Sequence, residues 1–201
     1  MKAPKTLLVR KHIDALKKLK GYTVSAGWFD TARYAPSSNG SPGPSVAYIA
    51  RINEFGATIQ IPARSQAYNV EFKQNKSGEV INKFVKLGTG TISNSGTANI
   101  PAYTIVIPPR PFMNFAFENF KKGSVGFKKK LANNLFNKGM SPDNALKEIA
   151  YYLESCIVMS IKDGPWEANS YYTIKNKGFD KPLIDKGIMW QTVTSKISKK
   201  D

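Results

Sequence analysis

Four carboxylates toward the C-terminus have side chains that could activate a water molecule: Asp163, Glu167, Asp180 and Asp185. A hydrolase or nuclease uses carboxylates in this way, as a general acid and base or as metal ligands. These four lie in segments typical of turns, without a histidine partner or a lysine–carboxylate motif beside them. Carboxylate-dependent hydrolysis is therefore only a remote hypothesis.

Three other reactive side chains lack partners in the sequence. His12, the only histidine, lies on the apolar side of a predicted helix, so we expect a packed histidine rather than a catalytic one. Cys156, the only cysteine, lies beside an apolar stripe, which predicts a small buried hydrophobe and excludes an internal disulfide. Glu54 has no second carboxylate at a defined spacing, so we interpret it as a positional or interface residue. We expect no catalytic residue, metal or cofactor.

The segment 88–102 is composed almost entirely of Gly, Thr, Ser, Asn and Ala. It lacks the Gly-Lys-Ser/Thr ending and the following helix of a phosphate-binding loop. It also offers little apolar surface to offset the cost of ordering, so we expect a mobile loop.

The charge balance favours acidic partners. The formal net charge is +16, and 41% of the 201 residues are apolar, which is typical of a globular chain. Solubility, contact with an acidic protein and contact with nucleic acid are all compatible with this charge. The densest patch comprises Lys121, Lys122, Lys128, Lys129 and Lys130. Apolar runs are short and the N-terminus lacks a signal-peptide core, so we expect no membrane span and synthesis in a cytoplasm.

Hydrophobic periodicity in the N-terminal half predicts an amphipathic basic helix over 6–19, packed on a sheet, and a half-buried strand over 22–28. A helix capped by Ser45 follows and ends at Gly56. The alternation over 67–87 predicts a β-hairpin.

The C-terminal half continues with a strand over 103–107 and a helix that begins after Pro111. A separate basic helix is expected over 127–138, a long core helix over 142–161, and an edge strand over 192–197. The stretch 177–190 contains glycine, proline and aspartate at turn positions, which predicts a corner of tight turns that could dock another protein.

These elements predict an α+β fold in a single domain, residues 1–201, in which a mainly antiparallel sheet packs against a long helix and several shorter ones. Residues 57–106 are predicted to be an insertion made of a β-hairpin and a flexible loop. Residues 198–201 are predicted to be a basic tail.

Three blocks together resemble a known family, the tail-completion or neck proteins of tailed bacteriophages, also called minor tail or virion morphogenesis proteins. The first block is residues 45–56, which ends Ile-Asn-Glu-Phe-Gly. The second is Ile-Pro-Pro-Arg-Pro-Phe-Met at 107–113, and the third is Lys-Gly at 177–178 followed by Lys-Pro-Leu-Ile-Asp-Lys-Gly at 181–187. The chain departs from the pattern at Lys186, where a threonine is usual, and in the length between the first two blocks.

The resemblance implies a non-catalytic α+β subunit of the virion that forms a ring in the neck or at the top of the tail and joins tail to head. It is assembled in the bacterial cytoplasm. We expect a hexamer, with a dodecamer as the alternative, in contact with neck, connector and tail-tube proteins and with passing DNA. The residues expected to shape or dock the subunit are Glu54, Phe55, Gly56, Pro108, Arg110, Pro111, Phe112, Lys181, Pro182, Leu183, Ile184, Asp185 and Gly187. The main alternative is a basic nucleic-acid-binding protein.

Overall fold

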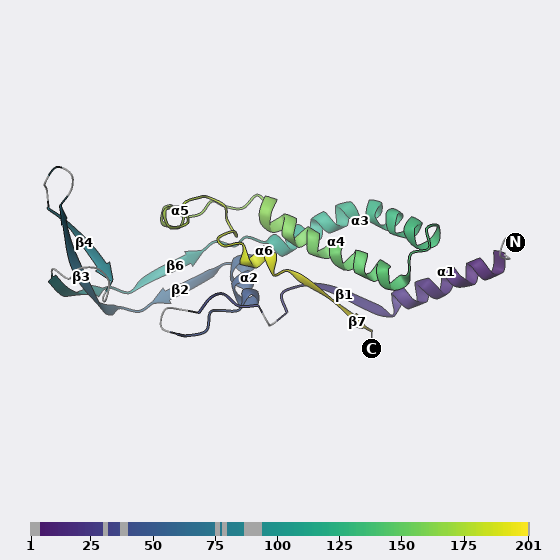
Figure 1. Ribbon diagram of the computed structural model, residues 1–201, viewed down its shortest axis with the longest axis horizontal. Helices are drawn as coiled ribbons and strands as arrows, with labels where there is room; N and C mark the ends of the chain where they lie inside the picture. The colour runs from purple at the N-terminus through teal and green to yellow at the C-terminus, as the bar shows by residue number, and fades with distance from the viewer. Residues whose placement is uncertain are drawn as a thin grey trace. The chain divides into compact units, whose positions relative to one another are not determined.

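A computed structural model describes residues 5–29, 32–36, 40–74, 77, 80–86 and 94–200 (Figure 1). It divides into two compact units, one formed by residues 1–56 with 108–201 and the other by Ala57–Ile107. The second unit occupies almost the same residues as the predicted insertion. The α+β fold class is confirmed, with helices and small antiparallel sheets.

The first unit combines six helices with one two-stranded sheet among its described residues. Strands β1 and β7 pair antiparallel, with Val24 opposite Ile197. The long helix α4 packs against both strands and against α3. The elements are α1 Lys5–Lys20, β1 Tyr22–Gly27, α2 Val46–Phe55, α3 Phe112–Phe136, α4 Pro142–Asp163, α5 Tyr171–Lys177, α6 Ile188–Gln191 and β7 Thr194–Lys199.

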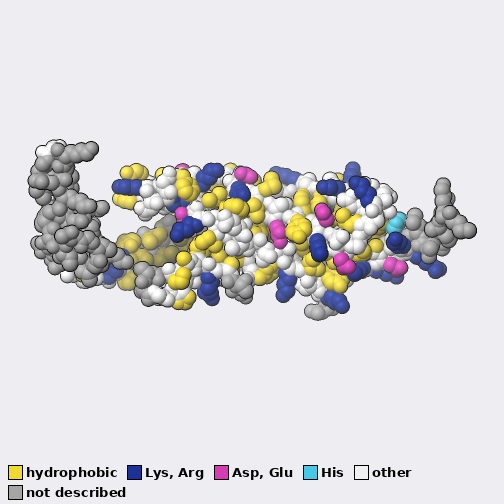
Figure 2. Space-filling model, viewed as in Figure 1, with side chains coloured by type: hydrophobic (Ala, Val, Ile, Leu, Met, Phe, Trp, Pro, Cys, Tyr) yellow, Lys and Arg dark blue, Asp and Glu magenta, His cyan; other side chains and the backbone are white. Residues whose placement is uncertain are grey.

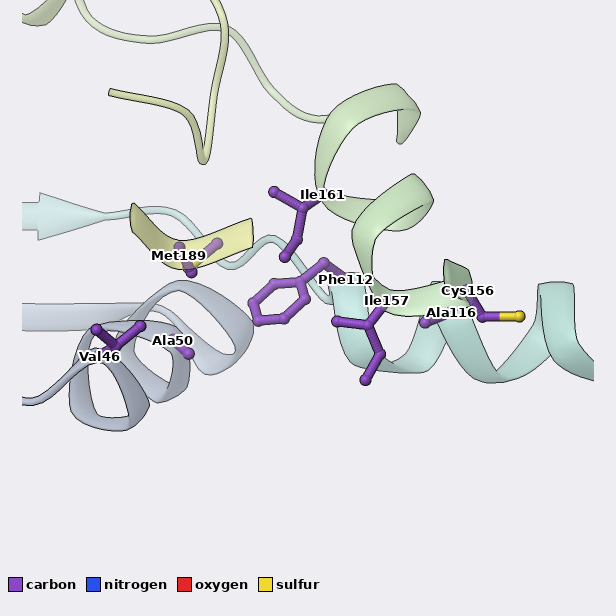
Figure 3. Packing of buried hydrophobic residues seen from close by; sticks show 8 residues of the cluster. All are labelled: Val46, Ala50, Phe112, Ala116, Cys156, Ile157, Ile161 and Met189. Atoms are coloured by element: carbon purple, nitrogen blue, oxygen red, sulfur yellow. The ribbon is translucent and has the colours of Figure 1, made fainter. Parts of the chain in front are cut away.

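The core of this unit forms where α2, α3, α4 and α6 meet (Figure 3). Phe112 is fully buried at the start of α3, and its ring reaches toward α2. Ile157 and Ile161 of α4 cover it, and their spacing of four residues places both on one face of the helix. The predicted long core helix is therefore confirmed, including its start: the hydroxyl of Ser141 accepts the backbone N–H of Asn144.

Helix α3 is continuous from Phe112 to Phe136, so the prediction of two separate helices was wrong. Gly123 and Gly126 have a low intrinsic preference for a helix interior. Packing on α4 overrides that preference: the ring of Tyr152 stacks on Phe127 with centroids 4.1 Å apart, and its hydroxyl lies close against Gly123.

Helix α1 has the predicted amphipathic pattern, but its apolar face is not covered as expected. Val9, Ile13 and Leu16 recur on one side and are 55%, 44% and 52% exposed. On another side, the ring of His12 contacts Phe136 at 4.7 Å between centroids. His12 is thus a packed histidine at the rim, while the apolar stripe of α1 remains largely open.

The second unit is entirely β in its described part and contains two small antiparallel sheets. Strands β2 (Ala57–Ile61) and β6 (Tyr103–Ile107) pair along their whole length, and β3 (Arg64–Gln74) lies between β4 (Val80–Lys86) and β5 (Asn94–Ile100). The β3–β4 pair confirms the predicted hairpin.

The expectation of a mobile loop over 88–102 was wrong for its second half. Residues Asn94–Ile100 form β5, in which backbone hydrogen bonding to β3 orders a segment with little apolar surface. Residues 88–93 lie outside the described part of the chain.

The C-terminal region contains two further departures from prediction. Helix α5, which was not predicted, begins at Tyr171 and is capped by the hydroxyl of Ser170, which accepts the N–H of Thr173. Ser198 and Lys199, expected in a basic tail, pair with Thr23 and Tyr22 in the sheet.

Candidate functional site

The first motif block is a helix whose ends are fixed by its own sequence. Ser45 caps α2 by accepting the N–H of Tyr48, and Gly56 ends the helix with a φ of 73°. Val46 and Ala50 face the core, whereas Phe55 is 74% exposed. Of the motif residues in this block, Phe55 is therefore available for docking and is not part of the core.

The second block is joined to the first by backbone and side-chain hydrogen bonds. The Arg110 N–H donates to the carbonyl of Asn53 at 2.7 Å. The Glu54 carboxylate accepts the N–H of Met113 at 2.8 Å and that of Asn114 at 3.3 Å. These are the second and third residues of α3, whose own first turn has no acidic residue. Glu54 thus caps α3 from another helix, a positional role in agreement with the prediction.

Arg110 is a buried cation, with only 7% of its surface exposed. Its Nε and Nη2 atoms both donate to the carbonyl oxygen of Glu167 at 3.3 Å. Burial lowers the pKa of the guanidinium, and the nearby carboxylates of Glu167 and Asp180 partly offset the shift. Within the described part of the chain, no carboxylate lies within 4 Å of this side chain to form an ion pair with it.

The third block forms the expected corner, with two glycines in the left-handed region. Gly178 ends α5 at φ 80°, and Gly187 precedes α6 at φ 78°. Leu183 also has a positive φ, 62°, which is uncommon for a side chain of its size. Leu183 and Ile184 are half-buried against the core, so they pack as predicted. Pro182 lies between these turns, and the carbonyl of Lys181 accepts the Lys177 ammonium at 2.7 Å.

The three blocks meet around one open pocket of about 560 Å³. The first block supplies Ile49 and Asn53, the second supplies Arg110, and the third supplies the turn from Leu183 to Gly187. Sequence motifs separated by more than fifty residues are therefore brought into one place. The predicted residues Phe55, Gly56, Pro108, Pro111, Phe112, Lys181 and Pro182 do not line this pocket.

Sequence reasoning missed several residues of this pocket, among them Tyr34, Asn169 and Asn176. They come from loops and from the short helix α5, where no periodic signal marks them. Burial raises the pKa of the Tyr34 hydroxyl, and the charge of Asp185 adds to the shift. Burial also lowers the pKa of the Lys177 ammonium, against the opposing effect of Asp185 and Asp180.

Several of the reactive residues considered at the outset have structural partners. Asp180 accepts the backbone N–H and the side-chain amide of Asn169 at 3.0 and 2.9 Å. Cys156 is buried in the core, and burial raises the pKa of its thiol, so its side chain behaves as a small hydrophobe. No group of three metal-ligating side chains gathers among the described residues.

The predicted lysine patch lies on α3. Lys121, Lys122, Lys128, Lys129 and Lys130 are all exposed. Lys121 pairs with Glu118 at 2.9 Å and covers the ring of Phe117, while the other four have no ion pair with any described residue. Figure 2 shows Lys and Arg side chains spread over the visible face, with Asp and Glu side chains scattered among them.

None of the helices within the described ranges has both the length and the apolar character needed to cross a membrane. A scan against protein-family models, a search of curated proteins and a search of solved structures each returned no match to this chain.

Proposed function

We propose that this chain is a non-catalytic structural protein of a tailed-phage virion, which forms a ring in the neck or at the top of the tail and joins tail to head. The observation that carries the proposal is the convergence of the three motif blocks. Glu54 of the first block caps the helix that opens in the second, and both blocks line one pocket with the third. The residues that resemble the family's pattern thus act together as one structural unit.

The polar motif groups are occupied by contacts that hold the shape of the subunit. Both oxygens of Glu54 accept backbone N–H groups, and Arg110 ties its segment to the carbonyl of Glu167. Groups used in this way fit a scaffold better than a catalytic site, because catalysis needs an acid, base or nucleophile free to meet a substrate.

Two exposed apolar surfaces favour assembly. The first is the stripe of Val9, Ile13 and Leu16 on α1. The second is the β2–β6 ribbon, where Ile59 pairs with Ile105 and both are exposed. Contiguous exposed apolar surface often marks a protein–protein interface, and a two-stranded ribbon has two edges able to pair with a neighbour.

The test is the size of the assembled protein, measured by light scattering and electron microscopy. We expect a closed ring with a hexamer as the main species, formed alone or on adding the neighbouring connector and tail-tube proteins. A chain that stays monomeric beside those partners contradicts the proposal.

Nucleic-acid binding is the second candidate, and the arrangement of lysines on α3 favours it. Lys121, Lys122, Lys128 and Lys129 form two pairs seven residues apart, so all four project from one side of the helix. A stripe of this kind can follow a phosphate backbone without reading bases.

Salt dependence tests this second candidate. We expect the affinity for duplex DNA to fall steeply with salt, and the combined change Lys122→Gln and Lys129→Gln to reduce the slope by about two. The matched control, Lys147→Gln with Lys175→Gln, removes the same charge from α4 and α5 and should affect the slope less. Wild-type affinity that does not depend on salt removes the candidate.

A further inference from the structure

The pocket where the three blocks meet contains a buried cation that forms no direct ion pair with any described carboxylate. Arg110 is only 7% exposed, and both of its hydrogen bonds go to a single carbonyl oxygen, that of Glu167. A guanidinium has five N–H donors, so both hydrogens on Nη1 and one on Nη2 have no partner among the described residues. These three hydrogens lie at the Nη1–Nη2 end of the guanidinium, which can bind a carboxylate through two parallel hydrogen bonds.

The surroundings make this pocket attractive to an anion. Lys177 and Lys186 line it as well, against one carboxylate among the lining residues, Asp185. Burial lowers the pKa of Lys177, Asp185 and Asp180 oppose that shift, and the positive charge of Arg110 adds to it. An anion bound in the pocket would stabilise the charged forms of both cations in this partly desolvated site.

Five apolar side chains share the wall with polar ones such as Asn53, Asn169 and Asn176, and they favour an apolar group as the carrier of the charge. Ile49, Leu183, Ile184, Ile188 and Met189 all line the pocket, whose volume of about 560 Å³ is in the range of sites for small ligands and side chains. A carboxylate attached to a branched aliphatic group can bury that group against these residues while its oxygens reach Arg110. A fully hydrated inorganic anion gains nothing from the apolar part of this wall.

We propose that the pocket binds a carboxylate carried by an apolar group, with Arg110 as the bidentate partner and Lys177 as the second cation. The carboxylate can belong to an acidic residue in a peptide segment of another protein or to a free small carboxylic acid. The proposal goes beyond the structural role proposed above and does not rest on it, because a single subunit contains the whole pocket.

The test uses the full-length wild-type chain and four probes in titration calorimetry: an acetylated Leu-Glu peptide amide, its Leu-Gln analogue, 4-methylpentanoate and inorganic phosphate. We expect the Leu-Glu peptide or 4-methylpentanoate to bind at least about tenfold more tightly than the Leu-Gln peptide and phosphate. Binding of the peptide alone identifies a protein segment as the source of the carboxylate, and equal binding of 4-methylpentanoate identifies a free acid. Absence of binding by both acids, or equal binding of the Leu-Gln peptide or of phosphate, overturns the proposal.

Two variants locate the site. Arg110→Gln should weaken binding of the acid by about tenfold or more, and Lys177→Gln by a smaller factor of about three to ten. Lys175→Gln, on the same helix as Lys177 but outside the pocket, should bind like the wild type. If circular dichroism shows that Arg110→Gln does not fold, the comparison of Lys177→Gln with Lys175→Gln tests whether the acid binds in this pocket. Equal affinity in those two variants contradicts the assignment.

Discussion

The Glu54 carboxylate lies at the N-terminus of a helix to which it does not belong and accepts the N–H of Met113 at 2.8 Å. The first N–H groups of a helix have no partner within it, and together they carry a partial positive charge. Here Pro111 precedes α3 without a side-chain cap, so a residue almost sixty positions earlier supplies the acceptor and the negative charge. One side chain thereby joins the end of α2 to the start of α3.

Removal of this contact should destabilise the first unit. We expect Glu54→Ala to lower the free energy of unfolding by about 1–2 kcal/mol, because two N–H groups lose their acceptor. Glu54→Gln should cost less, since its amide oxygen can still accept although it lacks the charge. Glu118→Gln is the control, because Glu118 is an exposed residue of α3, the helix that Glu54 caps, and the loss of its charge should cost no more than about 0.5 kcal/mol. Urea unfolding measures all three, and equal stability of Glu54→Ala and wild type contradicts the assigned role.

Gly187 is expected to tolerate no side chain. Its φ is 78°, and a Cβ there would come within 2.9 Å of Trp190 Nε1 and Gln191 Nε2. We predict that Gly187→Val prevents folding or costs at least about 2 kcal/mol. Lys186→Thr, a change to an exposed neighbour, should be tolerated.

The cost of the clash can be separated from the cost of the backbone conformation. Gly178 has nearly the same φ, 80°, but open space around the position of a Cβ. Gly178→Ala therefore measures the conformational cost alone, roughly 1–2 kcal/mol. Thermal unfolding should show Gly187→Ala to be the less stable of the two alanine variants, and the reverse order would refute the steric argument.

Local structure was predictable from the sequence where caps and periodicity agree. Ser45 and Gly56 bound α2, and Ser141 begins α4, as their residue types indicate. Prediction failed where tertiary contacts outweigh local preference, as in α3, where Tyr152 of α4 stacks on Phe127 and lies against Gly123. The pocket itself was not predictable, because the contact of Asn53 with Arg110 joins segments that no local signal relates.

The buried thiol of Cys156 should make stability depend on pH on the alkaline side. Burial raises its pKa in the folded chain, while the hydroxyls of Tyr152 and Ser155 partly offset the shift. In the unfolded chain the thiol ionises near its ordinary value, about 8.5. The contribution to stability is therefore complete below that value and is lost as pH rises through the folded pKa.

Cys156→Ala isolates this contribution from the titration of the many lysines and tyrosines. We expect the difference in free energy of unfolding between wild type and Cys156→Ala to be smaller at about pH 9.5 than at about pH 7.5. Reaction of the thiol with a disulfide reagent should be slow in the folded protein and fast in urea. A difference that stays constant with pH, together with fast labelling of the folded chain, would show that the thiol is not buried.

The apolar stripe of α1 should contribute to assembly more than to folding. Val9, Ile13 and Leu16 lie on one side of the helix and are about half exposed, so a charge at their centre removes little buried area within the subunit. A subunit neighbour that covers the stripe would have to bury that charge, which is costly. We expect Leu16→Glu to reduce the mass of the assembled particle while helix content and unfolding temperature stay near those of the wild type.

Lys11→Gln makes the same change in net charge on another side of α1 and should assemble normally. Light scattering over a range of protein concentrations compares the two, and normal assembly of Leu16→Glu would exclude the stripe from the interface.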